Sequence, residues 1–266
     1  MKHICWLHER AARKAGVAGG KGAGLAALCA AGFEVPDGFV ITTRVFREAA
    51  RDGDDLTRAH AADILRAYRR LGGPVAVRSS LVAEDGADRS FAGQLESRLN
   101  VEGDEAVLEA VRGVVRSAQR ASFASYAARA GAGAPAVEAD MGLAVVVQRM
   151  AEPLAAGAAF SVDPVTGERH VVIEAAAGLA DRLMGGTVVP SRFVVDTRGV
   201  LTVADRRDLD PGALPDDAVL RIGAVVRDVA DRAGTPQDVE WAWALRSSCS
   251  GWSNRSLRAP RSAWTR

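Results

Sequence analysis

The segment from Val75 to Ser80 constrains the fold most strongly, because it is an apolar, β-branched run that carries Arg78 near its end. Two acids, Glu84 and Asp85, follow it, and then comes the small-residue segment Ser90–Gln94. A strand that ends in a guanidinium and leads into a loop of small residues is suited to presenting positive charge to a bound anion. The segment therefore predicts a strand beside a phosphate-binding site.

The composition limits the classes of partner. The chain has 266 residues, of which 48% are hydrophobic and 25% charged, which is typical of a globular protein with one large domain or two lobes. Its formal net charge of +1 gives no broad basic surface, so we expect a small phosphorylated ligand and no nucleic acid.

The cysteines and the apolar segments indicate the compartment. The 3 cysteines are widely spaced and form no CxxC pair, which favours a reducing cytoplasm. Charged residues interrupt the N-terminal segment before a signal-peptide core can form, and the apolar runs are shorter than the roughly 20 residues of a membrane-spanning helix. We expect a cytoplasmic protein with no membrane contact.

Strand and helix patterns alternate along the chain in two unequal parts. We expect helices over Leu25–Ala31, Thr43–Ala50, Leu56–Leu71, Asp104–Ala130 and Asp216–Ala233. We expect strands over Phe39–Thr42, Val75–Arg78, Leu95–Val101, Leu143–Gln148, Gly157–Val162, His170–Ala175, Arg192–Asp196, Val200–Ala204 and Asp238–Ala242. The order predicts an α+β fold of two lobes with a cleft between them, and the Gly-, Ala- and Pro-rich residues near 131–140 are the expected boundary.

Lys21 lies within the glycine run Gly19–Gly24, which we expect to form a loop that feeds a helix N-terminus. Such a loop lets backbone amides approach an anion, and the lysine adds a full positive charge. The run is not a Walker A loop, because Gly22 stands where Ser or Thr should follow the lysine. The alternative is a flexible loop with no ligand.

Three further polar residues interrupt apolar runs, and each has two interpretations. Arg78 could bind a ligand anion or pair with Glu84 or Asp85, and Gln148 could bind backbone groups or a base or ribose. Glu240 could form a salt bridge or bind Mg²⁺, which prefers one or two carboxylates together with phosphate oxygens. The 4 histidines show no clustered spacing typical of a metal site, so we expect most of them at the surface.

Taken in order, these segments resemble the N-terminal ATP-binding domain of phosphoenolpyruvate synthase, pyruvate phosphate dikinase and rifampicin phosphotransferase. The resemblance runs from Gly16 to Ala242 and includes Val147–Met150, Ala159–Gly167 and Asp238–Trp241. It implies an ATP-grasp fold over residues 1–244, in which two α+β lobes hold Mg-ATP between them.

The resemblance also implies roles for particular residues. Lys21 and Arg78 would hold the phosphates and act in catalysis, and Gly93 and Ser97 would line the phosphate loop, with Ser97 in place of the usual threonine. Gln148 would contact the nucleoside, and Glu240 would bind Mg²⁺. The acceptor in this family is a histidine on a separate swivelling domain, which passes the phosphoryl group to pyruvate or another substrate.

The chain departs from the family pattern after Ala244. The family has a further strand that ends in Gln-Ser-Arg-Pro or Gln-Ala-Arg-Pro, but residues 245–266 read as a divergent tail through which a strand is hard to draw. We therefore expect a truncated or standalone domain, with a frameshift as a hypothesis for the tail. The leading interpretation is a phosphotransferase domain that needs a phosphohistidine-domain protein in trans. The alternatives are a non-catalytic nucleotide-binding module and an interaction domain that binds nothing.

Overall fold

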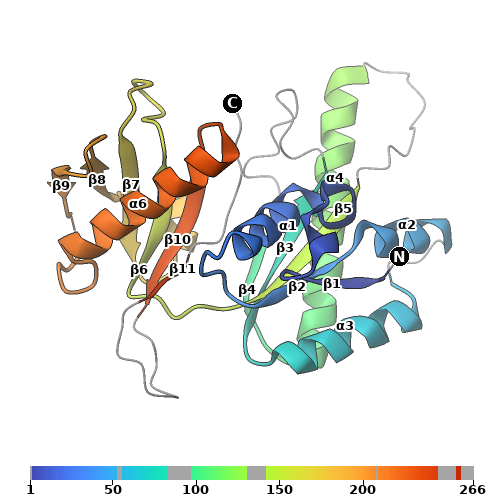
Figure 1. The fold of residues 1–266 in the computed structure, drawn as a ribbon. Helices are drawn as coiled ribbons and strands as arrows, with labels where there is room; N and C mark the ends of the chain where they lie inside the picture. The colour runs from blue at the N-terminus through green and yellow to red at the C-terminus, as the bar shows by residue number, and fades with distance from the viewer. Residues whose placement is uncertain are drawn as a thin grey trace. The chain divides into compact units, whose positions relative to one another are not determined.

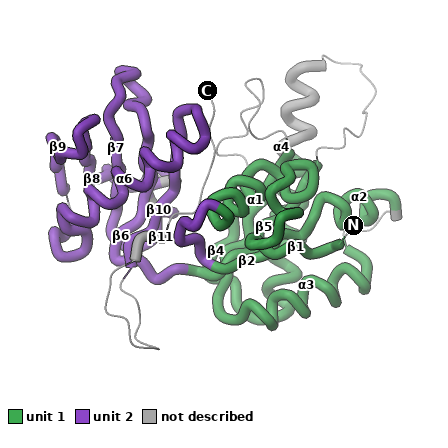
Figure 2. The backbone as a smooth tube through the Cα atoms, viewed as in Figure 1, with its two compact units in different colours: residues 1–30, 37–150 green, residues 31–36, 151–266 purple. Residues whose placement is uncertain are grey.

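The computed structural model describes residues 2–52, 56–82, 97–130, 142–207, 209–244 and 256–258. The chain forms two compact units, of which one contains residues 1–30 and 37–150 and the other contains residues 31–36 and 151–266 (Figure 2). The division falls after Met150 and not near residues 131–140, because the strand that ends at Arg149 hydrogen-bonds within the sheet of the first unit.

The first unit is built on a five-stranded sheet with the order β1-β2-β5-β3-β4, and all of its strand pairs are antiparallel (Figure 1). Its strands are β1 (Ile4–Trp6), β2 (Gly38–Ile41), β3 (Val75–Leu81), β4 (Ser97–Val101) and β5 (Leu143–Arg149). Its helices are the 3₁₀-helix η1 (Arg10–Arg13), α1 (Ala15–Ala30), α2 (Thr43–Asp52), α3 (Arg58–Leu71) and α4 (Asp104–Ala130).

The two faces of this sheet have different environments. Val75, Val77 and Leu81 of β3 pack with residues of α3 and α4 in one large buried cluster. Successive side chains on a strand point to opposite faces, so Ala76, Arg78 and Ser80 lie on the other face, which α1 covers. The sheet is therefore a core layer on one side and carries polar side chains on the side of α1.

The second unit contains a six-stranded antiparallel sheet with the order β11-β10-β6-β7-β8-β9. Its strands are β6 (Ala155–Phe160), β7 (Val171–Ala177), β8 (Ser191–Val195), β9 (Leu201–Asp205), β10 (Asp238–Ala244) and β11 (Ser256–Arg258). Its helices are α5 (Asp181–Met184) and α6 (Asp216–Ala233). The buried residues Ile222, Val226 and Val229 give α6 one apolar face, which packs against the sheet.

These observations confirm the predicted α+β class with two parts. Within residues 245–266, where a strand was hard to draw from the sequence, Ser256–Arg258 forms a short strand against β10. Among the helices that the structure describes, none combines the length and apolar character needed to cross a bilayer.

Candidate functional site

Helix α1 contains the glycine run, which the sequence predicted as a loop. The prediction is wrong except at Gly19, whose φ of 69° and ψ of 174° interrupt an otherwise helical segment. The reason is close packing: a Cβ at Gly22 would lie 3.2 Å from Val40 Cγ2 and 3.5 Å from Val146 Cγ2. Tertiary contact with the sheet therefore outweighs the low helix propensity of glycine.

Ser80 of β3 holds the break in α1. Its hydroxyl donates to the carbonyl oxygen of Ala18 at 2.7 Å and accepts from the backbone N–H of Gly22 at 3.0 Å. A Cβ at Gly19 would lie 2.2 Å from the Ser80 carbonyl oxygen, so only glycine fits there. Ser80 thus contacts the backbone of α1 from β3, in the same way that an N-cap side chain contacts the first turn of its own helix.

Lys21 lies in the first turn after this break. Its Nζ donates to the backbone oxygen of Ser79 at 3.3 Å, which brings the ammonium group to the strand that carries Arg78. The helix break, Lys21 and β3 therefore form one connected group of residues 18–22 and 78–80.

Arg78, Ser97 and Gln148 share the face of the sheet that α1 covers. Arg78 is opposite Ser97 on β4 and Val146 on β5, and Gln148 is two residues beyond Val146. Diagonal neighbours of this kind have Cα atoms about 7–8 Å apart, within reach of an arginine side chain. Gln148 is only 4% exposed, whereas Ser97 is exposed.

The structure thus brings together Lys21, Arg78, Ser97 and Gln148 on one side of one sheet. The predicted residue Gly93 lies outside the described residues, as do the possible Arg78 partners Glu84 and Asp85. Their part of the prediction remains a prediction.

Glu240 belongs to the second unit, on β10. It is opposite Ala158 of β6, and Glu174 of β7 is opposite the same alanine, so the two glutamates lie in one row across the sheet. Burial raises the pKa of the nearby Asp238 carboxyl to about 7, and the charges of Glu240 and Glu174 add to this effect. This face of the second sheet is therefore rich in carboxylates, and no local sequence motif indicates it because Glu174 and Glu240 are far apart in sequence.

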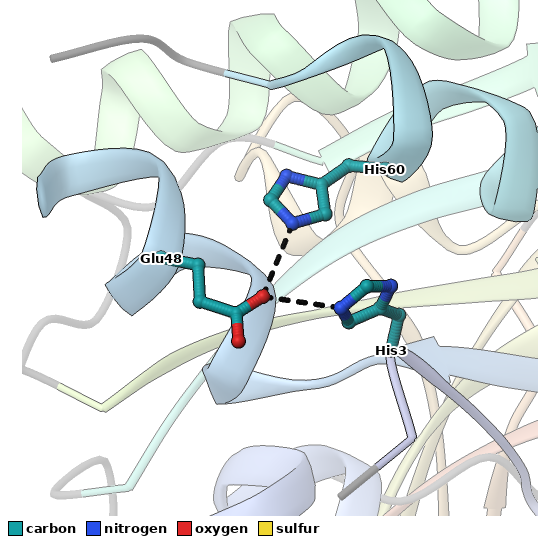
Figure 3. A group of neighbouring side chains, drawn as sticks. All are labelled: His3, Glu48 and His60. Carbon is teal, nitrogen blue, oxygen red and sulfur yellow. Dashed lines mark hydrogen bonds and ion pairs between the residues drawn. The ribbon is translucent and has the colours of Figure 1, made fainter. Parts of the chain in front are cut away.

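One cluster in the first unit also had no local sequence signal. His3, Glu48 and His60 come from three segments and meet through their side chains (Figure 3). His60 is 3% exposed, so it is an exception to the expectation that most of the histidines lie at the surface.

Comparison with known proteins places the chain in a family. Residues 54–211 match the family described as the pyruvate phosphate dikinase AMP/ATP-binding domain. A probable phosphoenolpyruvate synthase of Archaeoglobus fulgidus is 31% identical over 90% of this chain and 39% of its own length. A phosphoenolpyruvate synthase of Aeropyrum pernix is 34% identical over 72% of this chain and 28% of its own length.

A rifampicin phosphotransferase of a Streptomyces species is 32% identical over 84% of this chain and 32% of its own length. The chain therefore spans well under half the length of each of these three relatives. With more than half of its residues matched by the family, the chain belongs to the pyruvate phosphate dikinase AMP/ATP-binding domain family.

Proposed function

We propose that this ATP-binding domain binds Mg-ATP and transfers a phosphoryl group to a histidine on another domain or protein. The observation that carries the proposal is the placement of Lys21 and Arg78 at the same strand of one sheet face. Two cations from distant parts of the sequence at one place suit the several negative charges of a nucleotide triphosphate. The family membership supports ATP as the source of those charges.

Each residue of this face would have a role that follows from its chemistry. Arg78 and Lys21 would bind phosphate oxygens through charge-assisted hydrogen bonds, and the Ser97 hydroxyl would donate a further one. The buried Gln148 amide offers both donors and acceptors, which suits a base or ribose. Positioning and charge stabilisation of this kind account for most of the catalysis in phosphoryl transfer.

The carboxylate-rich face of the second sheet fits a magnesium ion chemically. Glu240 would hold the ion, and the neighbouring Glu174 and Asp238 add negative charge at that face. Mg²⁺ prefers oxygen ligands from one or two carboxylates and from substrate phosphates. When bound, the ion supplies positive charge that neutralises the phosphate oxygens.

Titration calorimetry with Mg-ATP tests the binding part. Lys21→Ala and Arg78→Ala should each weaken binding by about 1–3 kcal/mol, roughly 5- to 150-fold. Arg98→Ala is the matched control, because Arg98 lies on the opposite face of the sheet, beside α4. Its guanidinium packs so close to Gly113 of α4 that a Cβ there would lie 2.9–3.2 Å from it. Equal affinities for the wild type and the Lys21 and Arg78 variants would remove these residues from the site.

The transfer part needs a second assay. Labelled ATP is incubated with the chain and a purified phosphohistidine-domain protein, and the label on the histidine is measured. Transfer of label that Arg78→Ala abolishes supports a phosphotransferase. Tight Mg-ATP binding without transfer would instead show a non-catalytic nucleotide-binding module, and no binding by the wild type would overturn both interpretations.

A further inference from the structure

A cluster of two imidazoles and one carboxylate lies apart from the residues assigned to nucleotide binding. His3 precedes β1, Glu48 belongs to α2, and His60 is in the first turn of α3 (Figure 3). Helix α3 packs on the sheet face opposite to Arg78, so this cluster is separate from the Lys21 and Arg78 face.

One carboxylate oxygen faces both histidines. Glu48 Oε2 lies 3.1 Å from His3 Nε2 and 3.3 Å from His60 Nε2, and all three candidate ligand atoms lie within 4.8 Å of one another. A tetrahedral ion with bonds of about 2.0–2.1 Å holds its ligand atoms about 3.3–3.4 Å apart. Two of the three separations are thus close to those that an ion at the centre would impose.

Neighbouring side chains hold the ligands in this orientation. Asp63 Oδ2 lies 2.9 Å from His3 Nδ1, so the Nε2 atom of that ring is directed toward Glu48. Arg44 Nε donates to Glu48 Oε1 at 2.6 Å and leaves Oε2 toward the histidines. The Arg44 contact and the two histidines lower the pKa of the Glu48 carboxyl to about 2, so it is ionised. A carboxylate behind a ligating histidine is the usual outer support of a metal centre.

From this arrangement we propose that His3, Glu48 and His60 bind a divalent transition-metal ion, for which Zn²⁺ is the best candidate. Two imidazoles and one carboxylate are a ligand set that zinc accepts, with a water as the fourth ligand. A pocket of about 460 Å³, lined among others by His3, Arg44 and Asp63, adjoins the cluster at His3. The ion would link the segment before β1 to α2 and α3.

Protons occupy the site when no ion is bound. The backbone N–H of Thr57 donates to His60 Nδ1 at 3.4 Å, so His60 Nε2 carries a proton and donates it to Glu48. Ligation by Nε2 would place the ring proton on Nδ1, so the long Thr57 N–H contact to Nδ1 would be lost when the Nε2–zinc bond forms. His3 must likewise present an unprotonated Nε2 to ligate, with its ring proton on Nδ1 toward Asp63 Oδ2.

The test is thermal unfolding and titration calorimetry of the untagged chain with ZnCl₂ alone. For an affinity near 1 µM, zinc at 100 µM should raise the midpoint by roughly 5 °C or more, and EDTA should reverse the shift. Glu48→Gln and His60→Gln should each lose at least tenfold in zinc affinity. His170→Gln is the matched control, since His170 Nε2 lies 2.7 Å from Glu168 Oε2 in a pair outside the cluster.

A second measurement covers variants that fold poorly. Co²⁺ added to the wild type should give the intense visible absorption of a tetrahedral centre, and stoichiometric Zn²⁺ should abolish it. A wild-type chain that shows neither this spectrum nor a zinc-dependent midpoint overturns the proposal. Equal loss of zinc affinity in His170→Gln would also overturn it. Because Mg-ATP binding is measured separately, these results are independent of the proposed function.

Discussion

Ser79 and Ser80 are adjacent on β3 and both are buried, yet replacement of each by alanine should change stability in opposite directions. Ser80 Oγ donates to the Ala18 carbonyl oxygen at 2.7 Å and accepts from Gly22 N–H at 3.0 Å. Ser79 lies on the other face, where its buried hydroxyl has no hydrogen-bond partner among the described residues. The Ser80 hydroxyl thus holds the break in α1, whereas burial of the unpaired Ser79 hydroxyl destabilises the folded protein.

The magnitudes follow from these contacts. Ser80→Ala leaves one buried donor and one buried acceptor unsatisfied, at about 1–3 kcal/mol each, so we expect a loss of about 2–4 kcal/mol after partial relaxation. Ser79→Ala removes an unpaired hydroxyl from an apolar environment and should be neutral or stabilise the protein by about 1 kcal/mol. The difference in unfolding free energy between the two variants should be at least about 2 kcal/mol.

Urea unfolding followed by circular dichroism measures this difference, and calorimetry with Mg-ATP adds a second readout. Lys21 Nζ contacts the backbone oxygen of residue 79, which alanine retains, so Ser79→Ala should keep the wild-type affinity. Ser80→Ala should weaken Mg-ATP binding, because Lys21 directly follows the helix break and would lose its fixed position when the contacts to Ala18 and Gly22 are lost. Similar stabilities for the two variants, or a stable Ser80→Ala, would refute the assignment of Ser80 as the residue that holds the break.

Three other substitutions test the packing of both units. Gly19→Ala should lower the free energy of unfolding by about 2–6 kcal/mol, because the new Cβ strains the backbone and lies 2.2 Å from the Ser80 carbonyl oxygen. Gly16→Ala in the same helix should be tolerated, since its Cβ would meet no neighbouring atom within 4 Å. Urea unfolding measures both. Gly157→Ala should leave the second unit largely unfolded by circular dichroism, because its Cβ would lie 1.9 Å from a backbone oxygen of β7. Asp163→Asn should lose about 1–2 kcal/mol at pH 7. The pKa of Asp163 is lowered chiefly by backbone N–H donors, so this carboxylate stabilises the folded protein at pH values above its unfolded-state pKa of 3.8. The unfolding free energies of the wild type and Asp163→Asn should therefore converge as the pH falls below 3.8. A difference that stays constant with pH would contradict this cause.

Long periodic segments were predictable from the sequence alone. The helices over Asp104–Ala130 and Asp216–Ala233 have the predicted bounds, because their apolar residues recur with helical spacing over many turns. The strand of Arg78 and the strand of Gln148 were also identified, since apolar β-branched residues mark both. What the sequence pattern conveys well is which residues face a core.

The other features depend on contacts between distant segments. Glycine has low intrinsic helix propensity, so the helical conformation of Gly20–Gly24 depends on tertiary packing, such as the close approach of Gly22 to Val40 and Val146. The cluster of His3, Glu48 and His60 has no regular spacing along the chain, and a search for local metal motifs could not find it. The different roles of two adjacent serines likewise arise only when α1 lies against β3.

The alternation of side chains along β3 separates folding from ligand binding in the first unit. Val75, Val77 and Leu81 contribute to the core with α3 and α4, so their replacement should act through stability. Arg78 lies on the opposite face, between the row that contains Ser97 and the position of Lys21, so its replacement should act through the ligand. Ser80 belongs to that second face but is buried against α1, which couples the two effects at one residue. Substitutions along Val75–Leu81 should therefore alternate with a period of two. Those on the face of α3 and α4 should alter stability, and those on the face of α1 should alter ligand binding, or both binding and stability at Ser80.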